Sequence, residues 1–254
     1  KPRILVIFDT SGSMGIDVDT GLETGGDNSE DYPGNGGLSR LAVAKEVMSR
    51  IVQTTSEAEF ALMRYPQSEG LDLNPGTFGG DLYDGLAQNP LNYAGSCTGT
   101  LNPEADSAFS LLSPFAPDNE GDILSWMDNR ETWPMNRELR ASGPTPIVET
   151  LRLAREYIAL VLQADADVRC REYAIVVLTD GSESCVPSEE RIAELTRQTR
   201  SFGSIPINAE GGRVDKTVRV FVLGFDVNQR AINQLETVAR EGNTRSVYSG
   251  GDPE

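Results

Sequence analysis

The stretch that decides the fold is ILVIFDTSGSMG, residues 4–15. It opens with five large apolar residues, which are typical of a strand buried on both faces of a parallel sheet. The apolar run stops at Asp9 and is followed by the small residues Thr-Ser-Gly-Ser at positions 10–13. These side chains offer few apolar atoms for packing and many oxygen atoms. The stretch therefore predicts a central strand over residues 3–8 that ends in a polar site.

Other strands follow the same pattern. Residues 173–179 and 218–225 are short, almost wholly apolar and rich in Ile and Val, so we expect both in the centre of the same sheet. Residues 59–64 and 246–248 are expected to form outer strands.

Helices are predicted between and after these strands, because apolar residues recur there at helical spacing. The first helix follows Ser39 as its N-cap, the second opens at Pro146, the third follows Ser188, and the fourth stops at Gly242 as a C′ glycine. This alternation is typical of a Rossmann-like α/β fold, in which an open, mostly parallel central sheet carries helices on both faces. We expect residues 1–254 to form a single domain.

Two long segments interrupt the alternation. Residues 16–38 are rich in Gly, Asp, Glu and Asn, and residues 67–108 are rich in Gly, Pro, Asn and Asp. Connections of this length inside a compact domain usually serve a function or are disordered. The first leaves from the carboxyl end of the first strand, and open α/β sheets bind their ligands outside that edge. We interpret both segments as insertions into the fold.

Charge and composition exclude several classes of function. The chain has 39 acidic and 22 basic residues, and its net charge of −17 repels nucleic-acid phosphates and anionic lipid headgroups. It has no histidine, which removes Ser-His-Asp and Cys-His catalysis and histidine-bound zinc. No apolar run approaches the roughly 18 residues of a membrane span. The sequence has no P-loop and no activated nucleophile, so we do not expect an enzyme. From the net charge and the short apolar runs we expect neither nucleic-acid binding nor direct membrane insertion.

Three loops carry short side chains with oxygen atoms. They are residues 9–13 after the first strand, Ser-Gly-Pro-Thr-Pro at 142–146 just before a helix, and Thr-Asp-Gly at 179–181 after another strand. Each loop alone is common, but together, at these element boundaries, they indicate one shared site. A helix-capping turn without metal is the alternative for the first loop, and an N-cap role is the alternative for Thr145.

In these residues the chain resembles the von Willebrand factor type A domain, whose metal-ion-dependent adhesion site uses Asp-x-Ser-x-Ser, a Thr and an Asp. The resemblance covers nearly the full chain and implies a sheet with one antiparallel edge strand, with both insertions at the metal-binding edge. It also implies a resident Mg²⁺, or Mn²⁺ or Ca²⁺ in its place. The hydroxyls would ligate the ion directly, and the two acids would hold it at least partly through water. The residues at the matching positions are Asp9, Ser11, Ser13, Thr145 and Asp180.

The chemistry of these residue types agrees with a cation site. Mg²⁺ prefers near-octahedral oxygen ligands at roughly 2.0–2.1 Å and keeps several waters. Gly12 permits a sharp turn, so the serines on either side of it can converge on one point. Neutral hydroxyls leave much of the ion's charge uncompensated, and a carboxylate from a partner could then complete the coordination shell.

A second cation site is a weaker candidate. Asp17, Asp19 and Glu23 alternate along the first insertion as acids do in a calcium loop. The glycine at the sixth position and the glutamate at the twelfth position of an EF-hand are absent. The alternative interpretation is a solvated acidic loop.

The three cysteines, Cys97, Cys170 and Cys185, lack metal-binding spacing. A strand of about eight residues at roughly 3.3 Å each lies between Cys170 and Cys185, and this separation far exceeds the ~6 Å that a disulfide spans. The related fold places the loop that carries Cys97 at the metal edge, beside Cys185. The resemblance therefore implies a Cys97–Cys185 disulfide, and three reduced buried thiols are the alternative.

The resemblance implies a non-enzymatic adhesion or protein-interaction module that binds an acidic group of a protein or surface partner through the cation. The chain is also similar to the amino-terminal domain of type IV pilus tip adhesins. We therefore expect an extracellular or bacterial cell-surface location and a longer polypeptide. The alternative is a regulatory or assembly domain of an intracellular chelatase-like or AAA-partner complex. Intracellular cysteines stay reduced, so a disulfide distinguishes the two.

Overall fold

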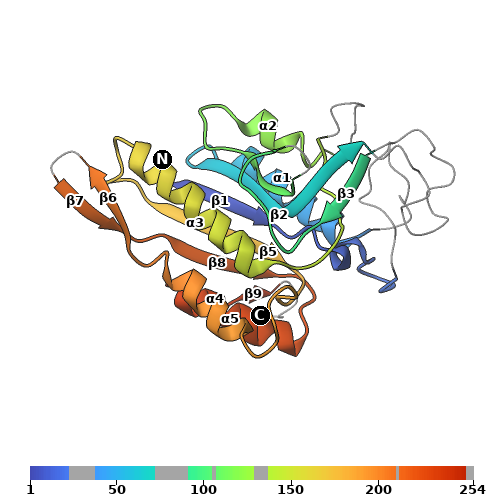
Figure 1. Cartoon of the computed structure of the whole chain (residues 1–254). Helices are drawn as coiled ribbons and strands as arrows, with labels where there is room; N and C mark the ends of the chain where they lie inside the picture. The colour runs from blue at the N-terminus through green and yellow to red at the C-terminus, as the bar shows by residue number, and fades with distance from the viewer. Residues whose placement is uncertain (23–37, 72–90, 105–106, 129–136, 210–211, 250–254) are drawn as a thin grey trace.

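The computed structural model describes residues 1–22, 38–71, 91–104, 107–128, 137–209 and 212–249. Its elements alternate between strands and helices along most of the chain (Figure 1). In chain order they are β1 (Arg3–Phe8), the 3₁₀ helix η1 (Gly12–Gly15), α1 (Arg40–Thr54), β2 (Glu59–Leu71), β3 (Leu91–Gly95), β4 (Phe109–Ser113), α2 (Glu120–Leu124), α3 (Ile147–Ala164), β5 (Tyr173–Thr179), α4 (Arg191–Arg200), β6 (Ile205–Ala209), β7 (Gly212–Lys216), β8 (Arg219–Gly224), α5 (Gln229–Glu241) and β9 (Tyr248–Ser249).

The central sheet has the strand order β3-β2-β1-β5-β8-β9. Strand β1 runs parallel to both β2 and β5, and β5 continues in parallel to β8 and β8 to β9. The outer edge of β2 is shared by two antiparallel strands, β4 beside residues 62–67 and β3 beside residues 67–71. The predicted α/β fold class, with a mostly parallel central sheet, is confirmed.

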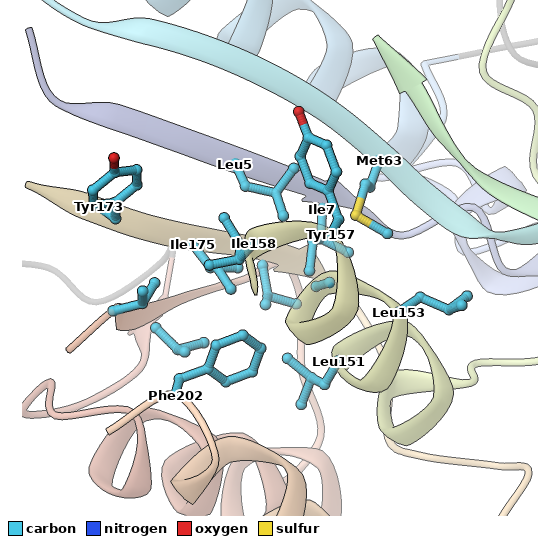
Figure 2. Packing of buried hydrophobic residues seen from close by; sticks show 14 of the residues in the cluster. Leu5, Ile7, Met63, Leu151, Leu153, Tyr157, Ile158, Tyr173, Ile175 and Phe202 are labelled. Atoms are coloured by element: carbon cyan, nitrogen blue, oxygen red, sulfur yellow. The ribbon is translucent and has the colours of Figure 1, made fainter. Parts of the chain in front are cut away.

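The strands alternate their side chains between two buried layers, because successive residues of a strand point to opposite faces. On one face the sheet packs with α3, α4 and α5. Figure 2 shows Leu5, Ile7 and Ile175 of the strands together with Leu151 and Ile158 of α3 in this layer. On the other face the sheet packs against α1 and α2. Helices on both faces leave the carboxyl ends of the parallel strands as the edge where loops gather.

The helix starts are partly as predicted. The Ser39 hydroxyl accepts a hydrogen bond from the Ala42 amide at 3.1 Å and caps α1, as expected. The predicted start of the third helix at Ser188 is wrong, because α4 begins at Arg191. The Ser188 hydroxyl instead hydrogen-bonds the side chain of the neighbouring Glu189, so it does not cap the helix.

The end of α5 corrects another detail. Gly242 is not the left-handed C′ residue, since its φ is −84° and the next residue, Asn243, takes the left-handed φ of 60°. A glycine is needed at 242 for a different reason. A Cβ there would lie only 2.6 Å from Cβ of Val220, so the helix end packs directly on β8.

The expected insertions contain more regular structure than their composition indicates. Strand β2 continues to residue 71, beyond its predicted end at 64, and residues 91–95 return as β3 antiparallel to residues 67–71. Part of the second insertion, residues 67–108, is therefore a strand hairpin. Residues 72–90 and 105–106 lie outside the described part of the chain.

Strands β6 and β7 form a separate two-stranded sheet that was not predicted. In Figure 1 this sheet lies at the opposite end of the molecule from β3.

The two ends of the first insertion lie together. The Val18 amide donates to the Leu38 carbonyl at 3.0 Å, and the Arg40 amide donates to the Ile16 carbonyl at 3.0 Å. This closure brings the first residue of α1 beside the loop that follows β1.

None of the described helices is long and apolar enough to cross a membrane.

Candidate metal centre

The three predicted loops meet at the carboxyl end of the parallel sheet. The Asp9 amide, just after β1, donates to the Leu178 carbonyl at 2.9 Å, which places the loops after β1 and β5 side by side. The Gly12 amide donates to the Gly143 carbonyl at 3.0 Å, which brings in the loop before α3. The structure therefore brings together all five residues of the predicted site, Asp9, Ser11, Ser13, Thr145 and Asp180.

The hydroxyls and one acid form a connected oxygen cluster. Ser11 Oγ and Ser13 Oγ lie 3.0 Å apart, within hydrogen-bond distance. Ser13 Oγ donates to Asp180 Oδ1 at 2.8 Å, across 167 residues of sequence. These contacts link the loop after β1 directly to the loop after β5.

The Asp9 side chain fixes the loop after β1 by two hydrogen bonds. Its Oδ1 accepts a hydrogen bond from the Ser11 amide at 2.7 Å, and its Oδ2 accepts one from the Thr179 hydroxyl at 2.6 Å. The side chain is fully buried. Burial, and then the nearby charge of Asp180, raise the pKa of Asp9 to about 7, against the lowering effect of these hydrogen bonds. Two buried acids at close quarters favour a cation between them.

Thr145 presents its hydroxyl to the same point. A Cβ built on Gly181 would lie 3.4 Å from Thr145 Oγ1 and 3.9 Å from Ser13 Oγ, so the missing side chain at 181 leaves space between them. The backbone of Thr145 is held on both sides by Ser184, whose hydroxyl accepts from its amide at 2.8 Å and whose amide donates to its carbonyl at 3.1 Å. Helix α3 takes Pro146, and not Thr145, as its N-cap.

The donor set fits a small hard cation. Among the described residues, no group of three or more His, Cys, Asp or Glu side chains could hold a metal by itself. Here two carboxylates combine with three hydroxyls around an open point, and Mg²⁺ accepts such oxygen ligands when waters complete its shell. The described residues therefore fit the ion that the sequence resemblance implies.

Arg40 is the residue that the sequence interpretation missed. It is the first residue of α1, and its Nη1 donates to Asp180 Oδ2 at 2.6 Å while its Nη2 pairs with Asp226. Burial alone would lower the pKa of Arg40, but the hydrogen bonds and charges of the two acids raise it. The sequence around Arg40 carries only a weak signal, because a positive charge in the first turn of a helix is mildly unfavourable against the helix dipole.

The β2–β3 hairpin contacts the loop after β1 and the loop before α3. Gln67 Nε2 donates to the carbonyls of Thr10 at 3.0 Å and Arg140 at 2.9 Å. Gly143 has a φ of +86°, which favours glycine. A Cβ on Gly143 would lie 2.5 Å from Cα of Gly95, the last residue of β3. The second insertion is therefore packed against the candidate site.

The second candidate cation site has a different local arrangement. Asp17 Oδ1 accepts hydrogen bonds from the amides of Asp19 at 3.0 Å and Thr20 at 2.7 Å. This oxygen closes a local turn, and these bonds lower the pKa of Asp17, those from Thr20 most strongly. Glu23, the third residue of the candidate site, lies outside the described residues.

A disulfide joins the two loops beside the site. Cys97 follows β3 and Cys185 follows β5, their Cα atoms are 5.4 Å apart, and the bond spans 88 residues. Glu183, next to this bridge, accepts hydrogen bonds from the amides of Cys185 at 2.6 Å and Val148 at 2.7 Å. Cys170 is an exposed free thiol.

Comparison with known proteins places the fold. No family model matches the chain, and no curated protein matches it. BatB from Bacteroides thetaiotaomicron matches with a TM-score of 0.51 and 14% identity, covering 100% of this chain and 92% of that one. An aerotolerance-related membrane protein from Bacteroides fragilis NCTC 9343, with multiple mutations to serines, matches with a TM-score of 0.50 and 15% identity, covering 99% and 92%.

A von Willebrand factor type A structure from Catenulispora acidiphila also matches, with a TM-score of 0.50 and 15% identity. The match covers 100% of this chain but only 39% of that one. At these identities the likeness concerns the fold alone. The chain has the von Willebrand factor type A fold, a mixed α/β arrangement around a mostly parallel sheet.

Proposed function

We propose that this chain is a non-enzymatic binding module that captures an acidic group of a protein partner through a divalent cation. Ser11, Ser13 and Thr145 would ligate the cation, and Asp9 and Asp180 would hold it at least partly through water. Mg²⁺ is the expected ion, and Mn²⁺ or Ca²⁺ could take its place. When bound, the ion would supply a Lewis-acidic position that a carboxylate can occupy.

One observation carries this proposal: three loops far apart in sequence bring three hydroxyls and two buried acids to one point. The Ser13–Asp180 hydrogen bond of 2.8 Å and the approach of Thr145 to Gly181 define that point. The protein groups hold the fixed part of the site. Ser13 lies in the 3₁₀ helix η1 and Ser11 is its N-cap, with the Ser11 amide bound to Asp9. The Ser184 hydroxyl accepts from the Thr145 amide and so positions Thr145.

The disulfide supports an extracellular or bacterial cell-surface location, because such bonds persist in oxidising compartments. This favours an adhesin-like role, pilus-associated in the narrower form of the proposal, over an assembly domain in an intracellular chelatase-like or AAA-partner complex. In this proposal the ligand is an acidic protein or surface group, and the chain acts as part of a longer polypeptide.

Carboxylate binding to the Mn²⁺-loaded protein tests the proposal. Bound Mn²⁺ speeds the relaxation of water protons, and acetate should reduce this effect by displacing a metal-bound water, whereas uncharged acetamide should not. EDTA should withdraw Mn²⁺ from the protein and so remove the part of the relaxation that is due to protein-bound Mn²⁺. In Thr145→Ala we expect Mn²⁺ affinity to fall about tenfold or more, because even indirect partners of a metal contribute roughly 10- to 100-fold.

Thr54→Ala is the matched control, since Thr54 is an exposed threonine at the end of α1 away from the site. It should behave like the original protein. A Thr145→Ala protein that binds Mn²⁺ with unchanged affinity would contradict the ligand assignment, and acetate without effect on loaded protein would contradict carboxylate capture.

A further inference from the structure

Arg40 holds two acids of very different exposure. Its side chain is only 14% exposed, and its partner Asp180 is fully buried, whereas Asp226 is 74% exposed. Among the described residues, Arg40 Nε has no hydrogen-bond partner. One half of this double ion pair is therefore a protected contact within the site, and the other half faces solvent, where ion pairs are weak.

Asp226 reaches Arg40 from an unfavourable backbone conformation. It lies in the loop between β8 and α5 and has a φ of +46°, in the left-handed region that non-glycine residues rarely adopt. The pairing with Arg40 spans 186 residues of sequence. An exposed acid held this way is poorly anchored, and it can be exchanged for another anion.

Arg40 and the candidate metal ligands share one cavity. Its volume is about 550 Å³, and its lining includes Ser13, Arg40, Thr145, Asp180 and Asp226. Asp180 lies between the two parts of this cavity, because its Oδ1 accepts from Ser13 and its Oδ2 accepts from Arg40. Two positions for negative charge, one at the proposed cation and one at Arg40, therefore lie on either side of a single carboxylate.

We propose that Arg40 is a second anion-binding group of this cavity and that Asp226 is its resident counter-ion, which an acidic partner displaces. This rests on the function proposed above and narrows the ligand class. The preferred ligand carries two carboxylates a few bonds apart, as neighbouring acidic side chains do, with one for the cation and one for Arg40. Asp226 then acts as a specificity filter, because a ligand with one carboxylate gains nothing by displacing it.

Glutarate and its monomethyl ester distinguish the two carboxylate positions. Both are titrated into Mn²⁺-loaded protein at constant ionic strength, with water-proton relaxation as the readout. We expect glutarate to bind more tightly than the ester. In Asp226→Asn the glutarate affinity should rise roughly threefold to fivefold, because an exposed pair no longer competes. In Arg40→Gln the preference for glutarate should disappear.

Glu57→Gln is the charge control, because it removes one exposed acid from the turn between α1 and β2, outside the cavity. It should leave the glutarate preference unchanged. Arg40→Lys keeps a positive charge, and circular dichroism checks that both Arg40 variants are folded. If the ester binds but glutarate is no better, and Asp226→Asn changes nothing, the inference is wrong while the proposed function stands. If neither glutarate nor its ester binds any Mn²⁺-loaded protein, the inference and the proposed function are both wrong.

Discussion

Glu138→Gln should lower the free energy of unfolding by about 3–5 kcal/mol, because removing one partner of a buried ion pair withdraws the charge that compensates the other. Glu138 pairs with Lys45 of α1, and their side chains are 0% and 1% exposed. In the Arg40–Asp180 and Arg171–Asp165 pairs, by comparison, the arginine side chains are 14% and 12% exposed.

The pair matters for the site as well as for stability. Glu138 lies at the start of the segment that leads through Arg140 and Ser142 to Thr145. The Leu139 amide donates to the Trp126 carbonyl at 2.9 Å, and the Ser142 amide donates to the Thr10 carbonyl at 2.8 Å. Losing the ion pair should loosen the start of this segment, so metal affinity should fall together with stability.

Urea denaturation followed by circular dichroism measures the effect. The matched control is Glu46→Gln. It breaks the pair between Glu46 and Arg50 on the exposed side of α1, the helix that carries Lys45. That change should cost less than about 0.5 kcal/mol, as exposed pairs four residues apart on a helix usually do. Equal small effects from both variants would show that the buried pair contributes no more than a surface pair.

Replacing both Cys97 and Cys185 by serine should lower the free energy of unfolding by about 4–5 kcal/mol. A cross-link that closes a long loop restricts the unfolded chain, and in the chain-entropy model a 100-residue loop corresponds to about 4.7 kcal/mol. The bond here joins residues 88 apart. It also ties the β2–β3 hairpin to the loop carrying Ser184, which holds Thr145.

The same loss should follow reduction of the original protein, because both treatments remove one cross-link. Cys170→Ser is the control, since that thiol is free and exposed, and it should change stability by less than about 0.5 kcal/mol. Thermal unfolding with and without reductant gives the comparison. If the double variant were as stable as the original protein, the bridge would contribute nothing beyond the packing around it.

The centre of the fold was predictable because buried parallel strands have uninterrupted apolar runs. The predicted bounds 3–8 and 173–179 match β1 and β5. The members of the candidate site were identifiable because each lies at an element boundary, where the short polar residues have no packing role. Ser39 was identifiable as a cap for the same reason, since a hydroxyl just before an apolar helix can satisfy its first amides.

The partners of Arg40 and the strand pairing inside the second insertion could not be predicted. Arg40 looks like an ordinary first-turn residue until the fold brings Asp180 and Asp226 to it. The β2–β3 hairpin was hidden because its sequence is rich in Gly, Asn and Asp, and its stability depends on pairing and on the close approach of Gly95 to Gly143. Such tertiary contacts outweigh local propensity.

Calorimetric titration of Mg²⁺ into the original protein and Ser11→Ala tests the central claim most directly. This variant removes the proposed ligand hydroxyl but keeps the amide that donates to Asp9 at 2.7 Å, so the turn should stay folded. Ser56→Ala is the control, because Ser56 is an exposed serine just after the C-terminal end of α1, and the site lies near the N-terminal end of that helix. The account predicts saturable binding of one Mg²⁺ by the original protein and the control, and its loss in Ser11→Ala. Equal Mg²⁺ affinity in all three proteins, or no binding to any, would contradict it.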